Sequence, residues 1–151
     1  MFGSNRRRED RSAETLIGLW TAKYGTRPHS DLIAAIEDWK TDRRGNFRFR
    51  MKGGRKLFVG EKTTENSGGK IKAVVESEGG WFSKSTIQDA WHMMLAQYSL
   101  GHRTISIDFG SKSSKAQMWA AAMMMDMTVE NYTPDAQAIE YLHELRNSPG
   151  R

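Results

Sequence analysis

The sequence contains no cysteine, and this absence excludes three kinds of chemistry together. Disulfide bonds, thiolate metal sites and cysteine nucleophiles all require that residue. No apolar run approaches the roughly eighteen residues that a membrane-spanning helix needs. The positively charged N-terminus is not followed by the apolar stretch of a secretory signal peptide. We therefore expect a cytoplasmic protein with no membrane association.

The motifs of nucleotide-binding proteins and of common hydrolases are also missing. Segment 110–115 lacks the paired glycines of a P-loop and the three glycines of a dinucleotide fingerprint. The chain has no Gly-x-Ser-x-Gly sequence and no ordered Ser, His and Asp set. Its four histidines are far apart, without carboxylates at ligand spacing. Asp108 is the best single carboxylate candidate, but the sequence favours a protein with no catalytic residues, cofactor or metal.

Carboxylates are absent from one strongly basic stretch in the first half of the chain. The protein carries 23 lysines and arginines against 18 aspartates and glutamates, a net charge of +5. This excess is modest evidence for a polyanionic partner. Positions 43–56 contain seven basic residues and no acidic one: Arg43, Arg44, Arg48, Arg50, Lys52, Arg55 and Lys56. The C-terminal third is close to neutral or acidic.

The same stretch has the pattern of a β-hairpin. Residues 46–52 alternate between apolar and basic side chains, as a half-exposed strand does. Gly53 and Gly54 predict a turn, and residues 56–59 predict a return strand. The basic face can then track a phosphate backbone, because the arginine fork binds two oxygens at once. The alternative is a solvated edge strand protected by charge; nucleic-acid contact is favoured because the seven charges lack compensation in the sequence.

Helical spacing of apolar residues predicts two helices in the N-terminal part. Ser30 is a good N-cap for the second helix, whose apolar face includes Ile36 and Trp39 and which is expected to end near Asp42. Residues 12–42 are therefore predicted to form a helical hairpin. Residues 1–11 are predicted to be a disordered basic leader.

The remaining chain alternates between strand and helix patterns. Residues 71–75 are expected to form a third strand, followed by a helix that is capped by Ser83 or Ser85 and stopped by Gly101. The expected elements after it are a strand at 104–109, a methionine-rich core helix at 114–125, a strand at 127–132 and a final helix after Asp135. A helical crossover implies that the last strands are parallel. We predict an α+β fold in which residues 43–147 form one mixed sheet packed with helices, as one unit with the N-terminal helical pair.

Segment 110–115 is a secondary candidate site, at the junction of a strand and a helix. A helix N-terminus offers free backbone N–H groups to an anion, so the possible anion-binding residues are Ser111, Lys112, Ser113 and Lys115. A plain N-cap at Ser113 or Ser114 explains most of this composition.

From Gly54 to Leu145, the order of motifs resembles a domain family of mobile genetic elements. The matching segments are residues 54–58, 87–95, 104–107, 110–111, 118–121 and 129–134. They are similar to the large polyvalent protein-associated domain of the seventh type, found in plasmid relaxases and in phage and conjugative-element polyproteins. The family has phenylalanine shortly after its Gly-Ser and glycine where Asp126 and Met127 stand, and this chain departs at both places.

The resemblance implies a bacterial protein that works beside the DNA-processing machinery of a plasmid, phage or conjugative element. It supplies no catalytic residues. Together with the basic hairpin, it predicts a non-enzymatic accessory protein that contacts the backbone of DNA or RNA. The alternative is a protein-interaction module that docks on a relaxase, a secretion coupling protein or a host defence enzyme. A small hydrolase or transferase is a third hypothesis.

Overall fold

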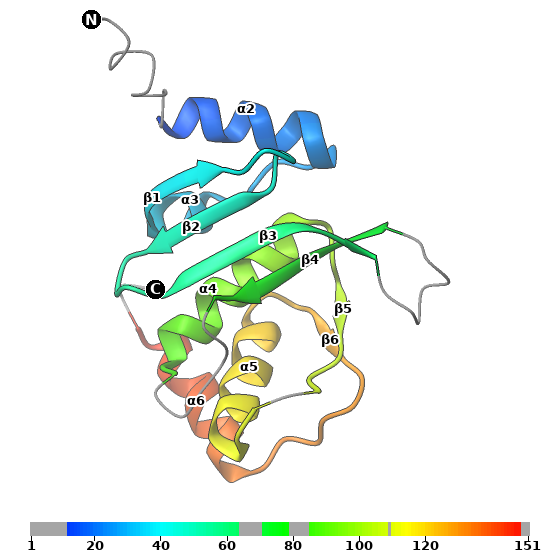
Figure 1. Ribbon diagram of the computed structural model, residues 1–151. Coiled ribbons are helices and arrows are strands. Elements are labelled where there is room, and N and C mark those ends of the chain that lie inside the picture. Colours follow the sequence, from blue (N-terminus) through cyan, green and yellow to red (C-terminus); the bar gives the residue numbers. More distant parts are fainter. Residues whose placement is uncertain (1–11, 64–70, 79–84, 109, 149–151) are drawn as a thin grey trace, which may run out of the picture.

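The computed structural model describes residues 12–63, 71–78, 85–108 and 110–148 (Figure 1). The predicted leader at 1–11 lies outside the described residues. The elements follow one another as α2 (Ala13–Tyr24), α3 (Ser30–Ala35), β1 (Ile36–Thr41), β2 (Phe47–Met51), β3 (Lys56–Thr63), β4 (Ile71–Ser77), α4 (Ile87–Ser99), β5 (Thr104–Ile105), α5 (Lys112–Met124), β6 (Thr128–Val129) and α6 (Ala136–Arg146). This mixture of helices and mainly antiparallel strands confirms the α+β class.

Strands β1 to β4 pair in sequence order as an antiparallel sheet. The predicted hairpin is β2–β3, in which Phe49 lies opposite Leu57. At its turn, Gly53 and Gly54 have φ values of +100° and +99°. Backbone in this region strongly favours glycine, so the turn occurs where the sequence predicts it.

The second N-terminal helix is much shorter than predicted. It ends at Ala35, and the chain continues as strand β1. The expectation of a helix up to Asp42 is wrong, and the reason is a bulge at the start of β1. Ile36 pairs with Met51 and Trp39 with Phe49, with a register shift between them. Because of the extra residue in the bulge, Ile36 and Trp39 face the same side of the strand although they are three positions apart. Apolar residues at this spacing are also typical of one face of a helix.

Aromatic side chains fill the space between the sheet and the N-terminal helices. Phe47 and Phe49 are each 1% exposed, and Trp20 of α2 is fully buried. The Trp20 ring centroid lies 5.5 Å from that of Phe47 and 6.2 Å from that of Phe49. Its Nε1 also donates to the carbonyl oxygen of Ser99, 3.3 Å away, at the end of α4. These contacts fix α2 to the sheet and to the central helix.

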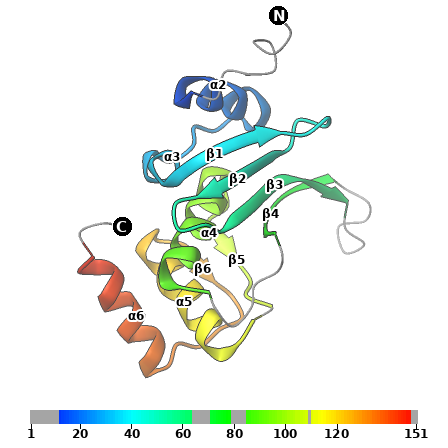
Figure 2. The same cartoon turned by 60° about the vertical axis from the view of Figure 1, so that its left-hand side comes forward.

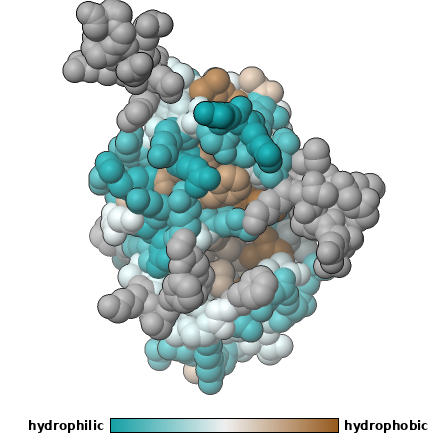
Figure 3. Space-filling model, in the orientation of Figure 1, coloured by the Kyte–Doolittle hydropathy of each residue, from teal (hydrophilic) through white to brown (hydrophobic). Residues whose placement is uncertain are grey.

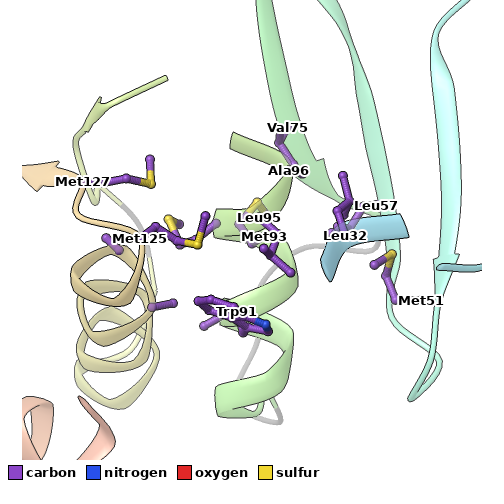
Figure 4. Packing of buried hydrophobic residues seen from close by; sticks show 14 of the residues in the cluster. Leu32, Met51, Leu57, Val75, Trp91, Met93, Leu95, Ala96, Met125 and Met127 are labelled. Carbon is purple, nitrogen blue, oxygen red and sulfur yellow. The ribbon is translucent and has the colours of Figure 1, made fainter. Parts of the chain in front are cut away.

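The C-terminal part has a core of alanine and methionine. Helix α4 is buried continuously from Ala90 to Ala96, because it packs on the sheet and on α5. In Figure 4, Leu95 of α4 lies between Leu57 of the sheet and Met125 after α5. The predicted core role of the methionine-rich helix is confirmed by its buried residues Ala116 and 119–122, whereas Met118, Met123 and Met124 are only partly buried. No helix in the described ranges has the length and apolar character needed to cross a membrane.

Strands β5 and β6 are parallel, as predicted, but they form a sheet of their own. The prediction of one mixed sheet is therefore wrong. The pairing covers only two residues on each strand, because the side chain of Asn131 then replaces the backbone ladder. Its Oδ1 accepts from the N–H of Ile107 (2.7 Å), and its Nδ2 donates to the Ile107 carbonyl (3.3 Å). Both strands are consequently shorter than the sequence pattern suggests.

Candidate nucleic-acid interface

The arginines of β2 project from the side of the sheet opposite the aromatic core. We call this side the outer face. Phe47, Phe49 and Met51 are buried on the inner face, whereas the side chains of Arg48 and Arg50 are 39% and 50% exposed. Helices α3 and α4 lie behind the strands in Figure 1, α4 lies behind them in Figure 2 as well, and no helix of the described residues covers the outer face. The alternation predicted for β2 is confirmed.

Carboxylates from other elements accompany these arginines. Arg48 Nη1 lies 3.1 Å from Oε1 of Glu78, which follows β4. Arg50 Nε lies 3.1 Å from Oε1 of Glu37, in the bulge of β1. The interpretation of the basic stretch as uncompensated is therefore wrong, because strand pairing brings in carboxylates that are distant in sequence. Half-exposed ion pairs of this kind contribute only about 0–1 kcal/mol, so exchanging a carboxylate for a phosphate costs little.

Arg55 occupies a different environment from Arg48 and Arg50. Its guanidinium lies 3.1 Å from Oδ2 of Asp89, and the two side chains are only 17% and 13% exposed. Asp89 also accepts from the backbone N–H of Thr86 in the capping box of α4. A second guanidinium nitrogen donates to Ser77 Oγ at 3.1 Å. Arg55 thus ties the hairpin to the start of α4.

Exposed basic residues stand at both ends of β2. Arg43 and Arg44 lie in the turn before it, and Lys52 and Lys56 lie around the turn after it. The first turn is held by Asp42, whose Oδ1 accepts from the backbone N–H groups of Arg44 (2.8 Å) and Asn46 (3.0 Å). Burial alone would raise the pKa of the Asp42 carboxyl, but these hydrogen bonds outweigh burial and lower the pKa.

Among the described residues, two adjoining hollows open beside the hairpin. The first hollow has a volume of about 310 Å³ and lies over β1, β2 and β3. The second has a volume of about 500 Å³ and lies between the Gly53-Gly54 turn and the start of α4. Lys56 and Glu78 line both hollows and lie between them. Their basic side chains are Lys40, Arg48, Arg50, Lys52, Arg55 and Lys56, against the carboxylates Asp38, Glu78 and Asp89. Figure 3 shows hydrophilic residues around a smaller hydrophobic area on this side of the molecule.

Phe58 is a half-buried aromatic residue on the outer face, and the sequence interpretation missed it. It lies opposite Arg48, whose guanidinium carbon is 5.1 Å from the ring centroid. A Cβ added to Gly60 would lie 2.6 Å from Phe58 Cζ, so the ring extends over that glycine. The sequence did contain a signal: Leu57 and Val59 mark the inner face, which places Phe58 on the opposite side.

Segment 110–115 forms the beginning of α5. Ser111 is the N-cap, and its Oγ accepts from the backbone N–H of Ser114 at 3.1 Å. The prediction of a cap at Ser113 or Ser114 is therefore wrong, because Gly110, with φ +116°, turns the chain just before Ser111 and the helix begins earlier. Ser113 Oγ lies 2.8 Å from the Tyr141 hydroxyl, and Lys112 Nζ lies 3.9 Å from Asp135 Oδ2. Lys115 is half-buried, and anion binding at this segment stays a prediction.

Asp108 lies beside a strand end, and His92 lies in the core. Asp108 Oδ1 accepts from Asn131 Nδ2 at 3.0 Å, beside the end of the β5–β6 pairing. His92 is buried in α4, and its Nδ1 has no hydrogen-bond partner in the described part of the chain. Burial lowers the pKa of His92, although Asp89 opposes the shift. The residues that the structure describes contain no cluster of three or more His, Asp or Glu side chains suited to a metal ion.

Comparison of the chain with protein-family models, curated proteins and solved structures gave no match. The resemblance to the large polyvalent protein-associated domain therefore stays a prediction. What the molecule itself offers is an outer face on which basic side chains outnumber carboxylates, over a buried aromatic core on the inner face.

Proposed function

We propose that the protein binds nucleic acid through the outer face of the β1–β4 sheet. The observation that carries this proposal is the position of Arg48 and Arg50. Both project from a face that no described helix covers, and their present partners are exposed carboxylates. Phosphate oxygens offer arginine the same forked geometry as a carboxylate. A nucleic-acid backbone can therefore replace Glu78 and Glu37 at these two side chains.

The wider charge balance supports the same function. The two hollows have six basic side chains and three carboxylates among their described lining residues. Arg43 and Arg44 add exposed positive charge in the turn before β2. Each phosphate contact releases condensed counterions, which makes binding favourable and sensitive to salt. Arg55 contributes by holding the hairpin against α4, rather than by contacting the ligand.

The role that we propose for this binding is that of an accessory protein of a plasmid, phage or conjugative element. This proposed role rests on the resemblance of residues 54–145 to the mobile-element domain. The alternative is a protein-interaction module that docks on a relaxase, a secretion coupling protein or a host defence enzyme. It is favoured by one observation, the interleaving of Glu37, Asp38 and Glu78 with the basic residues, because such patterns give specificity between proteins.

Fluorescence anisotropy with generic labelled oligonucleotides at low salt tests the proposal. The double variant Arg48→Gln/Arg50→Gln should lose most of the binding of the unaltered protein. Lys112→Gln/Lys115→Gln removes the same charge from the start of α5, the secondary candidate site. It should retain more binding than the outer-face variant, and an equal or larger loss would place the phosphate contact at α5 instead. No binding by the unaltered protein at low salt would refute nucleic-acid binding and leave the interaction module.

A further inference from the structure

The outer face carries an aromatic platform among its charges. Phe58 extends over Gly60, and Gly60 pairs with Val74 of the neighbouring strand β4. Phe58, Gly60 and Val74 therefore form an apolar area on a face that is otherwise charged. Any side chain larger than hydrogen at position 60 would collide with the Phe58 ring and with Asn46. Gly60 thus leaves the space in which the Phe58 ring lies along the strand, and a planar ligand can lie against the ring.

Basic groups lie next to this platform rather than far from it. Arg48 is the cross-strand neighbour of Phe58, and Lys56 is two residues before it on the same face of β3. Lys56 also lines both hollows, which continue toward the Gly53-Gly54 turn. A ligand that reaches Phe58 with a planar group therefore has one cation on the β2 side and another along β3 for its charged groups, whereas Glu76 is the cross-strand neighbour on β4.

Single-stranded and double-stranded nucleic acids match this arrangement differently. In a duplex the bases are stacked inside and paired, so an aromatic side chain on a sheet cannot lie against them. An unpaired strand exposes its bases, which stack on aromatic side chains while the backbone follows a basic groove. Stacking of this kind tolerates every base, because each base has a π face.

We infer that the ligand of the outer face is single-stranded DNA or RNA, with one base stacked on Phe58 and the adjacent phosphates bound by Arg48 and Lys56. This inference rests on the proposed function and specifies its ligand. Arg50 and Lys40 extend the contact along the first hollow, and Lys52 extends it along the second. Base identity is not read by such stacking, so binding with little sequence preference is expected.

The test compares three labelled DNA ligands of equal length, about fifteen nucleotides: oligo(dT), a mixed-sequence duplex and a strand of abasic sites. Oligo(U) and an RNA duplex repeat the comparison for RNA. We expect the unaltered protein to prefer each single strand over its duplex by at least about fivefold. Phe58→Leu should weaken oligo(dT) binding by about fivefold to about a hundredfold. It should leave the affinities for the abasic strand and the duplex unchanged, since those ligands present no free base.

Phe58→Trp is the second variant, because tryptophan keeps an aromatic plane at the position. It should bind oligo(dT) at least as tightly as the unaltered protein, and circular dichroism verifies folding of both variants. Equal binding of duplex and oligo(dT), or weaker oligo(dT) binding by folded Phe58→Trp, would overturn this inference and leave the proposed function intact. Failure to bind any of the oligonucleotides would instead overturn the proposed function and this inference with it.

Discussion

The sheet region and the helical region of this protein are built from different residues. The first 84 residues contain 18 lysines and arginines against 11 carboxylates, whereas the last 67 contain 5 against 7. Aromatic rings fill the sheet core around Trp20, Phe47 and Phe49. Alanine and methionine fill the helical core, where residues such as Ala121 are fully buried. Charge and rigid packing thus occur together in one half of the molecule.

The difference follows from the two periods of secondary structure. In β2, a period of two residues places a buried ring and an exposed arginine next to each other in the sequence. Arg48 and Arg50 therefore each lie between two buried side chains along the strand. In the helical region, α4 is enclosed by the sheet on one side and by α5 on the other. That enclosure leaves α4 little surface for a ligand and makes it the support of the sheet.

The largest expected effect comes from the aromatic core. Phe49→Ala should lower the free energy of unfolding by about 3–5 kcal/mol, because it leaves a cavity beneath the outer face. Urea denaturation followed by tryptophan fluorescence measures the change. A loss below about 1 kcal/mol would contradict the claim that stacked rings form a rigid base for the arginines.

The connection between the two regions should give the next largest effect. Arg55→Met removes the largely buried pair with Asp89 and should cost about 2 kcal/mol of stability. Affinity for nucleic acid should remain close to that of the unaltered protein under conditions where the variant is folded. If affinity falls as far as it does in Arg48→Gln/Arg50→Gln while stability is unchanged, Arg55 is a ligand contact and not a support.

The methionine core should respond more weakly than the aromatic core. Met94→Leu conserves volume in a buried site of α4 and should cost less than about 1.5 kcal/mol. The same urea denaturation measures it. A loss above about 1.5 kcal/mol would contradict the description of the helical core as adaptable.

The smallest expected effect is a pH dependence of stability that the buried His92 of the helical region causes. Burial lowers the pKa of His92 from its ordinary value of 6.5, so the unfolded chain takes up a proton first as pH falls. The stabilisation from neutral His92 is complete above pH 6.5 and is lost as pH falls from there through the lower folded pKa. Unfolding measured at neutral and mildly acidic pH should show a smaller loss for His92→Gln. Identical pH profiles would contradict this assignment.

The parts of the fold that depend on local pattern could be predicted from the sequence. The alternation in β2 and the glycine turn after it each occur within a few residues, and both are present. The cap of α6 at Asp135 is equally local. Strand β1 could not be predicted in this way, because its bulge gives Ile36 and Trp39 the spacing of a helix face.

The charge environment of the candidate site depends on distant pairing. Glu78 reaches Arg48 only after β3 and β4 have formed, and the sequence alone leaves Arg48 apparently unpaired. The exact position of the α5 cap depends on the backbone turn at Gly110, which composition does not specify. Phe58 was accessible to sequence reasoning, since its neighbours Leu57 and Val59 already define the inner face.

The salt dependence of oligonucleotide binding tests the central claim most directly. The logarithm of the binding constant, plotted against the logarithm of salt concentration, should fall linearly for the unaltered protein. Arg48→Gln/Arg50→Gln should bind more weakly, and its slope should be shallower by about 1.4 for a single strand, since two phosphate contacts are lost. A slope identical in both proteins, or no binding by the unaltered protein at low salt, would contradict the assignment of the outer face as a nucleic-acid interface.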